Sequence, residues 1–261
     1  MGIDKNFEQL VLRLYTEEDK EIFSFEYESK KYWLKKARAT KSFFSHKLFY
    51  KIFPIEVLLP VEEKSNNESI KFETTKIKSL KDKGVNTPNI SYQNDNFFVL
   101  EDCGKTANSN IRKKDISKNT MYYFIDKLLL EISKIHNLNE FHGGAQARNF
   151  TYKDEKIFVI DLEDSFDKSI ELKVLQLRDL ILFLLSLTKT RASFDVDYEY
   201  VINKYIELCP MNRDFKIKLK ELSQKISFLI TISQISFVNK IIGRDGQGFF
   251  KLFLILKNLK G

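Results

Sequence analysis

The stretch FHGGAQARNFTYKDEKIFVIDLED, residues 141–164, decides how this chain is interpreted. It holds His142, then Asn149 in a polar loop, then the apolar run Ile157–Ile160, which Asp161 follows directly. A short apolar run of this kind predicts a buried strand. An amide oxygen on a loop and a carboxylate just past a strand end are oxygen ligands of the kind that Mg²⁺ accepts, usually together with phosphate oxygens. The spacing therefore predicts a magnesium site made by Asn149 and Asp161.

The hundred residues at the start of the chain favour strands. Residues 21–36, EIFSFEYESKKYWLKK, alternate apolar and polar side chains around a charged turn, which is typical of a β-hairpin. Residues 69–83 carry apolar side chains at helical spacing and stop at Gly84, so they predict a helix. Phe97–Leu100 predicts another short buried strand.

The pattern changes after Gly104, where helices dominate. Residues 121–136 predict a strongly apolar helix, and helical spacing continues from Glu171 to the end. We therefore expect an α+β fold with two lobes: a β-rich lobe over residues 1–101 and a helical lobe over residues 102–261. The last segment, FFKLFLILKNLK, fits a final packing helix or, alternatively, a helix lying on a membrane surface.

These segments together resemble the protein-kinase-like superfamily, and most of all the bacterial lipopolysaccharide core sugar kinases. In KYWLKKAR, either Lys35 or Lys36 resembles the strand-terminal lysine that binds ATP. Neighbouring side chains point to opposite faces of a strand, so only one of the two lysines reaches the phosphates. Lys35 is preferred, because YWLK resembles the family's strand-terminal lysine pattern. In KFETTKIKSLKDKGVNTP, Glu73 resembles the helix glutamate that pairs with this lysine. FFVLEDCG resembles the strand and hinge that meet adenine, which implies cofactor contacts by Leu100, Glu101 and Cys103.

The resemblance covers residues 21–187 and implies a protein-kinase-like fold that binds ATP and Mg²⁺ between its lobes. It implies that His142 belongs to the catalytic loop, where it supports the loop by hydrogen bonds, and that Asn149 and Asp161 hold the metal. The segment VLQLRDLILFLLSL resembles the family's helix of the second lobe, and Arg178 and Asp179 within it are expected to anchor the catalytic loop.

The chain departs from the family pattern at the phosphate loop, the base and the metal motif. No glycine occurs between Gly2 and Gly84, so there is no glycine-rich phosphate loop. Gly144 stands where the family has its catalytic aspartate. Glu163 and Asp164 follow the metal aspartate, and either of them would serve as proton acceptor, bind a second Mg²⁺ or remain a plain surface charge.

The leading functional hypothesis is an ATP- and Mg²⁺-dependent phosphotransferase that acts on a sugar hydroxyl of a lipopolysaccharide-type glycolipid. One alternative is a pseudokinase, a nucleotide-binding or scaffold protein, which the glycine at position 144 favours. A further alternative is an atypical serine/threonine protein kinase. The retained pair of Asn149 and Asp161 favours an enzyme, because a pseudokinase has no need of a metal pair.

The composition limits the partners and the compartment. The chain has 43 Lys and Arg against 36 Asp and Glu, a net charge of +7, and a pI of about 9.1. Most of these cations are lysines, whereas nucleic-acid readers rely on arginine, so no nucleic acid is expected as a partner. Two cysteines form no disulfide framework, and no signal-peptide core or membrane-spanning apolar run is visible. We expect a cytoplasmic bacterial protein, with peripheral contact to the anionic inner face of the membrane as an alternative.

Overall fold

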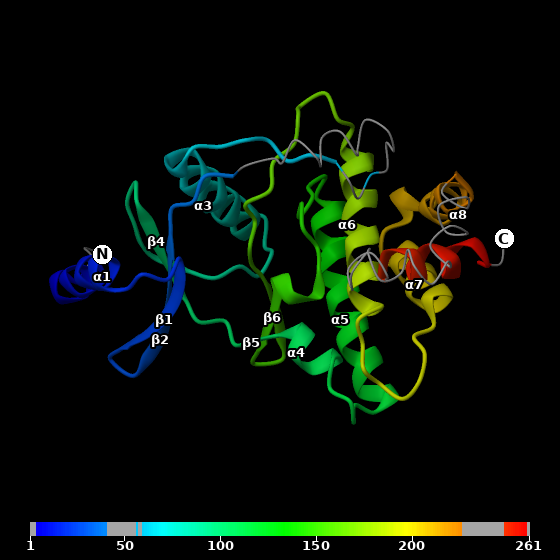
Figure 1. Cartoon of the computed structure of the whole chain (residues 1–261), viewed down its shortest axis with the longest axis horizontal. Coiled ribbons are helices and arrows are strands. Elements are labelled where there is room, and N and C mark those ends of the chain that lie inside the picture. The colour runs from blue at the N-terminus through cyan, green and yellow to red at the C-terminus, as the bar shows by residue number, and fades with distance from the viewer. Residues whose placement is uncertain (1–3, 41–55, 57–58, 226–247, 260–261) are drawn as a thin grey trace, which may run out of the picture. The chain divides into compact units, whose positions relative to one another are not determined.

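The computed structural model describes residues 4–40, 56, 59–225 and 248–259, which form two compact units. The first unit combines a four-stranded sheet and two helices with the later segment Thr151–Ser169, and the second contains Thr106–Phe150 and the helices that follow Ile170. Figure 1 shows these elements coloured along the chain. A β-rich first part and a helical second part confirm the predicted α+β class.

The predicted hairpin is present as β1 (Ile22–Tyr27) and β2 (Lys30–Lys36), joined by a two-residue turn. Glu28 and Ser29 in this turn both have left-handed backbones, with φ of 47° and 60°. That conformation matches the twist of the flanking strands. The sheet continues with β4 (Phe97–Glu101) and β3 (Ile90–Gln93) in the antiparallel order β1-β2-β4-β3.

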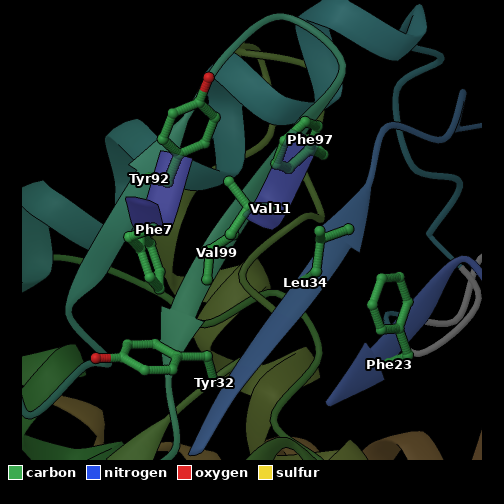
Figure 2. Close-up of a cluster of buried hydrophobic side chains, with 8 residues drawn as sticks. All are labelled: Phe7, Val11, Phe23, Tyr32, Leu34, Tyr92, Phe97 and Val99. Carbon is green, nitrogen blue, oxygen red and sulfur yellow. The ribbon is translucent and has the colours of Figure 1, made fainter. Parts of the chain in front are cut away.

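The helix α1 (Lys5–Glu17) covers one face of this sheet. Figure 2 shows Phe7 and Val11 of the helix together with buried side chains from all four strands of the sheet. Successive strand residues point to opposite faces, so Leu34 of β2 joins this cluster while Lys35 points to the other side. The apolar cluster contains Phe7, Val11, Phe23, Tyr32, Leu34, Tyr92, Phe97 and Val99.

The helix α3 (Asn66–Asp82) lies against the opposite face of the sheet, the face on which Lys35 lies. It begins three residues before the predicted start, because Ser65 and Glu68 form a capping box that satisfies the first free backbone N–H groups. Its end agrees with the prediction, since Gly84 follows with a φ of 83°. Ile70, Ile77 and Leu80 are buried on its inner side.

A second hairpin, β6 (Phe150–Lys153) and β7 (Lys156–Val159), forms a small sheet with β5 (Lys105–Thr106). Its turn residues, Asp154 and Glu155, are again left-handed. The N–H of Val159 donates to the carbonyl of Asn86, just past α3, at 2.8 Å. This bond ties the end of β7, and with it the residues that follow, to the first unit.

The second unit is built around α5 (Lys118–Asn137) and the almost wholly buried α6 (Leu172–Leu187). Residues 248–257 are helical, and Leu252, Phe253 and Leu256 are fully buried, which favours the packing helix over the membrane-surface helix. In the described residues, no helix has the length and apolar character needed to cross a membrane. The remaining helices are α4 (Ala107–Ile111), α7 (Tyr198–Leu208) and α8 (Phe215–Lys225), with short 3-10 turns at Ala147–Asn149 and Pro210–Asn212.

Candidate active site

Lys35 leaves β2 on the face that α3 covers, and its ammonium group meets Glu73 of that helix. The distance from Lys35 Nζ to Glu73 Oε2 is 2.8 Å, and both side chains are largely buried. Lys36 points the other way, where its ammonium donates to the carbonyl of Glu18 and lies over the ring of Tyr15. The predicted pairing is therefore made by Lys35 and not by Lys36.

Two further carboxylates from the segment after β7 reach the same ammonium group. Lys35 Nζ lies 3.1 Å from Asp161 Oδ1 and 3.1 Å from Glu163 Oε2. Asp161 has a φ of 61°, a left-handed conformation that few non-glycine residues adopt. The intervening Leu162 is fully buried, and its burial anchors this turn in the protein interior. One lysine thus holds three carboxylates from two separate segments, α3 and the residues after β7.

The three carboxylates of this cluster outnumber its one ammonium group, and this excess of acid affects the pKa values of Lys35 and Glu73. Burial alone would lower the pKa of Lys35, but Glu73, Asp161 and Glu163 outweigh burial and hold it above its usual range. Burial raises the pKa of Glu73 to about 7, and Lys35 offsets only part of that increase. Lys35 therefore stays charged, while Glu73 lies close to the point at which it takes up a proton. A surplus of negative charge remains around the lysine.

Asp164 acts on a second lysine of this region, Lys64. Burial lowers the pKa of Lys64, and the negative charge of Asp164 is the largest influence that opposes this shift. Lys64 Nζ also donates to Ser165 Oγ at 2.8 Å. Glu163 thus contacts Lys35, whereas Asp164 acts on Lys64, and the roles predicted for the two carboxylates stay predictions.

The residues expected to meet adenine lie at the end of β4 and just after it. Leu100 pairs with Trp33 across the sheet, and the Glu101 carboxylate accepts a hydrogen bond from Asn89 Nδ2 at 2.7 Å. The Cys103 thiol donates to the Glu101 carbonyl, and burial raises the pKa of this thiol to about 11. Cys103 is thus no reactive thiolate near neutral pH. Its contact with adenine, like that of Leu100 and Glu101, stays a prediction.

Asp102, which is not among the predicted site residues, organises the segment that follows β4. Its carboxylate accepts from Trp33 Nε1 at 2.7 Å and from the N–H of Gly104 at 3.1 Å. Burial would raise the pKa of Asp102, but these two hydrogen bonds and the nearby Lys31 lower it. Gly104 has a φ of 84°, and a Cβ there would stand 2.3 Å from the carbonyl oxygen of Tyr152. The Asp-x-Gly spacing is the signal that predicts such a turn.

The loop that carries His142 and Asn149 lies in the second unit and is anchored by Asp179 of α6. The Asp179 carboxylate accepts from the backbone N–H of His142 at 2.6 Å and from that of Gly143 at 2.9 Å. Within the loop, the N–H of Gly144 donates to His142 Nδ1 at 3.2 Å, and Asn149 Nδ2 donates to the Gly144 carbonyl at 2.8 Å. The predicted anchoring by Asp179 is confirmed.

Asp179 is itself part of a buried polar network. His136 Nε2 lies 3.4 Å from it, and His136 Nδ1 lies 2.6 Å from the Tyr205 hydroxyl. Asn212 Nδ2 donates to the same hydroxyl and to the Gln176 side chain. Burial would raise the pKa of Asp179, but the hydrogen bond from His136 and the nearby cationic groups lower it. The carboxylate is therefore ionised and held in place.

The donor atoms predicted for Mg²⁺ suit a hard cation. Asn149 uses its amide nitrogen on Gly144, which leaves the amide oxygen as the atom suited to a metal, and Asp161 contacts Lys35 through Oδ1 alone. Across the described residues, no group of three or more His, Cys, Asp or Glu side chains makes a metal site by itself. Mg²⁺ does not require one, because it usually takes one or two carboxylates together with phosphate oxygens.

No protein-family model matches this chain. It is 29% identical over 210 residues, which is 80% of each chain, to an uncharacterized protein of Haemophilus influenzae. Similar solved structures include the gentamicin complex and the streptomycin–ATP complex of APH(2")-IIa, each with 11% identity, a TM-score of 0.37, and coverage of 100% of this chain and 98% of theirs. Another is the aminoglycoside phosphotransferase APH(2'')-Ib with ADP bound, with 12% identity, a TM-score of 0.36, and coverage of 96% of this chain and 99% of its own. Likeness at this level assigns no substrate.

Proposed function

We propose that this chain is a kinase-like phosphotransferase that uses ATP. The observation that carries the proposal is the position of Lys35, whose ammonium group lies 2.8 Å from Glu73 on α3 and 3.1 Å from Asp161 after β7. In phosphoryl transfer of the kinase type, a strand lysine held by a helix glutamate binds phosphate, and an aspartate beyond a later strand holds the metal. The three residues occur here in that chain order and in direct contact.

Each residue has a distinct task in this proposal. Glu73 holds Lys35 so that its ammonium group binds the phosphates. Asn149 and Asp161 hold Mg²⁺ through their oxygens, and the ion supplies neutralisation of phosphate charge. His142 and Asp179 keep the loop that presents Asn149 in place. The adenine end of the nucleotide rests on Leu100, Glu101 and Cys103.

The acceptor in this proposal is an alcohol group, and its finer identity is the sugar hydroxyl of a lipopolysaccharide-type glycolipid. The support for this acceptor is the sequence resemblance over residues 21–187. The net charge of +7 also suits peripheral docking of a cytoplasmic protein on an anionic membrane face. The acceptor proton passes to Glu163 or Asp164 or directly to solvent, because position 144 carries no carboxylate.

A pseudokinase is the second candidate, and Gly144 favours it. In place of a catalytic aspartate, this position offers only a backbone carbonyl, which Asn149 engages through its amide nitrogen. A pseudokinase of this design retains nucleotide binding or scaffold activity and transfers no phosphate.

Nucleotide calorimetry with and without Mg²⁺ tests the proposal. We expect ATP binding that Mg²⁺ strengthens, that Lys35→Met abolishes, and that Lys36→Met leaves intact, because Lys36 faces Tyr15 and Glu18. Asp161→Ala and Asn149→Ala are expected to abolish phosphate transfer, and Glu163→Ala or Asp164→Ala to reduce it by about 10²–10⁴-fold if either is the base. A wild-type chain that binds no ATP at millimolar concentration, with or without Mg²⁺, would refute the proposal.

Gly144→Asp separates the enzyme from the pseudokinase. Gly143 has a φ of 100° and favours glycine, whereas the backbone of Gly144 lies outside the left-handed region, so its conformation does not require glycine. We expect Gly144→Asp to raise phosphate transfer to a lipopolysaccharide core acceptor, measured as acceptor-dependent ADP release. If ATP binds but neither the wild type nor this variant releases ADP with any hydroxyl acceptor, the pseudokinase is the correct function.

A further inference from the structure

We infer that Lys35 and Arg38 form a two-cation site for a phosphate group, and that the Glu163 carboxylate is its internal occupant in the absence of nucleotide. The inference rests on the proposed function, since it names how the phosphate chain of the nucleotide is gripped. It assigns a binding role to Arg38 and an occluding role to Glu163.

The geometry is that of a bridging anion. Glu163 Oε2 lies 3.1 Å from Lys35 Nζ, and the other oxygen of the same carboxylate, Oε1, lies 3.4 Å from a terminal nitrogen of Arg38. A phosphate group with two of its oxygens at these positions would contact the same two cations. Arginine presents a planar fork of donors that suits phosphate, and lysine adds a compact point charge.

The chain needs a second cation because it lacks the usual backbone cradle. Glycine-rich loops bind phosphate through closely approaching N–H groups. Here the strand edge beside Lys35 is β1, since Ile22 lies directly opposite Lys35, and the residues that lead into it, Glu18–Glu21, contain no glycine. Arg38 stands at this end of the hairpin, 3.3 Å from Glu21. It is mostly exposed and therefore free to turn toward a ligand.

Of the three carboxylates on Lys35, Asp161 at 38% and Glu163 at 25% have exposed side chains, and of these two only Glu163 also contacts Arg38. The Glu73 side chain is 4% exposed and is enclosed between α3 and the sheet, so it cannot turn away from Lys35 into solvent. The Glu163 side chain is 25% exposed, and its partner Arg38 is exposed as well, so release into solvent costs little. An incoming phosphate then replaces one anion by another and adds no new charge conflict around Lys35.

Calorimetry with ATP and with inorganic tripolyphosphate, both without Mg²⁺, tests the inference. Glu163→Gln removes the internal competitor and is expected to tighten the binding of both ligands about tenfold. Arg38→Ala removes one cation and is expected to weaken both about tenfold. The matched controls are Glu17→Gln and Arg13→Ala, which make the same changes of charge in the surface ion pair of α1.

The outcomes separate the inference from the proposed function. If ATP binds but Glu163→Gln and Arg38→Ala behave like their controls, the inference is wrong and the nucleotide function stands. If tripolyphosphate binding depends on both residues while ATP binds no tighter than tripolyphosphate, the anion site is real and the nucleotide function is wrong. If no variant binds either ligand at millimolar concentration, both are overturned.

Discussion

Two buried carboxylates, Glu73 in the first unit and Asp179 in the second, have pKa values that are shifted in opposite directions. Burial raises the pKa of Glu73 to about 7, whereas the pKa of Asp179 is lowered although burial acts on it in the same way. The difference lies in their partners. Asp179 accepts two backbone N–H groups and has His136 beside it, while Glu73 shares a single lysine with two other acids.

This contrast distinguishes a framework from a binding site. A carboxylate whose oxygens are matched by fixed donors cannot change partner without a large loss of free energy, so Asp179 holds its loop rigidly. A cluster with more acid than base is only partly satisfied by the protein, and a cation or a change of partner relieves it. The Lys35 cluster therefore has the properties expected of a site that rearranges when ligand binds.

The largest expected effect is that of Asp179→Ala. It leaves the N–H groups of His142 and Gly143 buried without an acceptor, so we expect a loss of about 3–5 kcal/mol in the free energy of unfolding. Urea denaturation measures it. Asp126→Ala is the control, since Asp126 makes an exposed bond to Tyr200. A loss for Asp179→Ala no greater than for this control would show that the network is not a framework.

Lys35→Met is expected to cost less stability, about 1–3 kcal/mol, although it removes the cation from three acids. The reason is the pKa of Glu73, which is already about 7, so that this residue takes up a proton at little cost once the lysine is gone. Urea denaturation at pH 7 measures the loss. A loss larger than that of Asp179→Ala would reverse the contrast between the two units.

Asp102→Asn tests the segment after β4, where we expect a smaller loss of unfolding free energy that depends on pH. The variant loses one charged acceptor for Trp33 and Gly104, and we expect a loss of about 1 kcal/mol at pH 7, since solvent partly screens the site. The folded pKa of Asp102 is lowered, so its stabilisation is present above the unfolded pKa and disappears as pH falls through the folded value. The gap between wild type and variant should therefore shrink below about pH 4. A gap that stays constant down to pH 2 would contradict this.

Ser65→Ala has the smallest expected effect. Loss of the capping box at the start of α3 should cost about 0.5 kcal/mol of unfolding free energy, because its hydrogen bonds are exposed. Because Glu73 lies two turns further along the helix, ATP affinity should stay within about twofold. Thermal unfolding and calorimetry on the same variant measure the two quantities. Ser169→Ala, in an exposed loop, is the control, and an equal loss there would mean that the cap contributes nothing specific.

Much of the local structure followed from patterns in the sequence. The alternation in residues 21–36 predicted the hairpin, and the apolar spacing before Gly84 predicted α3. The pairing of Lys35 with Glu73 was implied by the resemblance to the protein-kinase-like superfamily. The start of α3 was missed by three residues, because a capping box depends on the reciprocal bonds of Ser65 and Glu68 rather than on apolar spacing. Arg38 was missed because an arginine in a basic chain carries no signal of its own.

Periodicity and turn chemistry are local, so the residues alone establish strands, helices and the face to which a side chain points. They also place Asp179 on an apolar helix, whereas its contact with the loop at His142 and Gly143 is a tertiary one. Which charges meet is a different matter, because Glu73, Asp161 and Glu163 are separated along the chain by up to 90 positions and come together only when α3 and β7 pack around β2. Coulomb interactions depend on distance in space and on burial, so the surplus of acid on Lys35, the bridge to Arg38 and the opposite pKa shifts of Glu73 and Asp179 arise from packing.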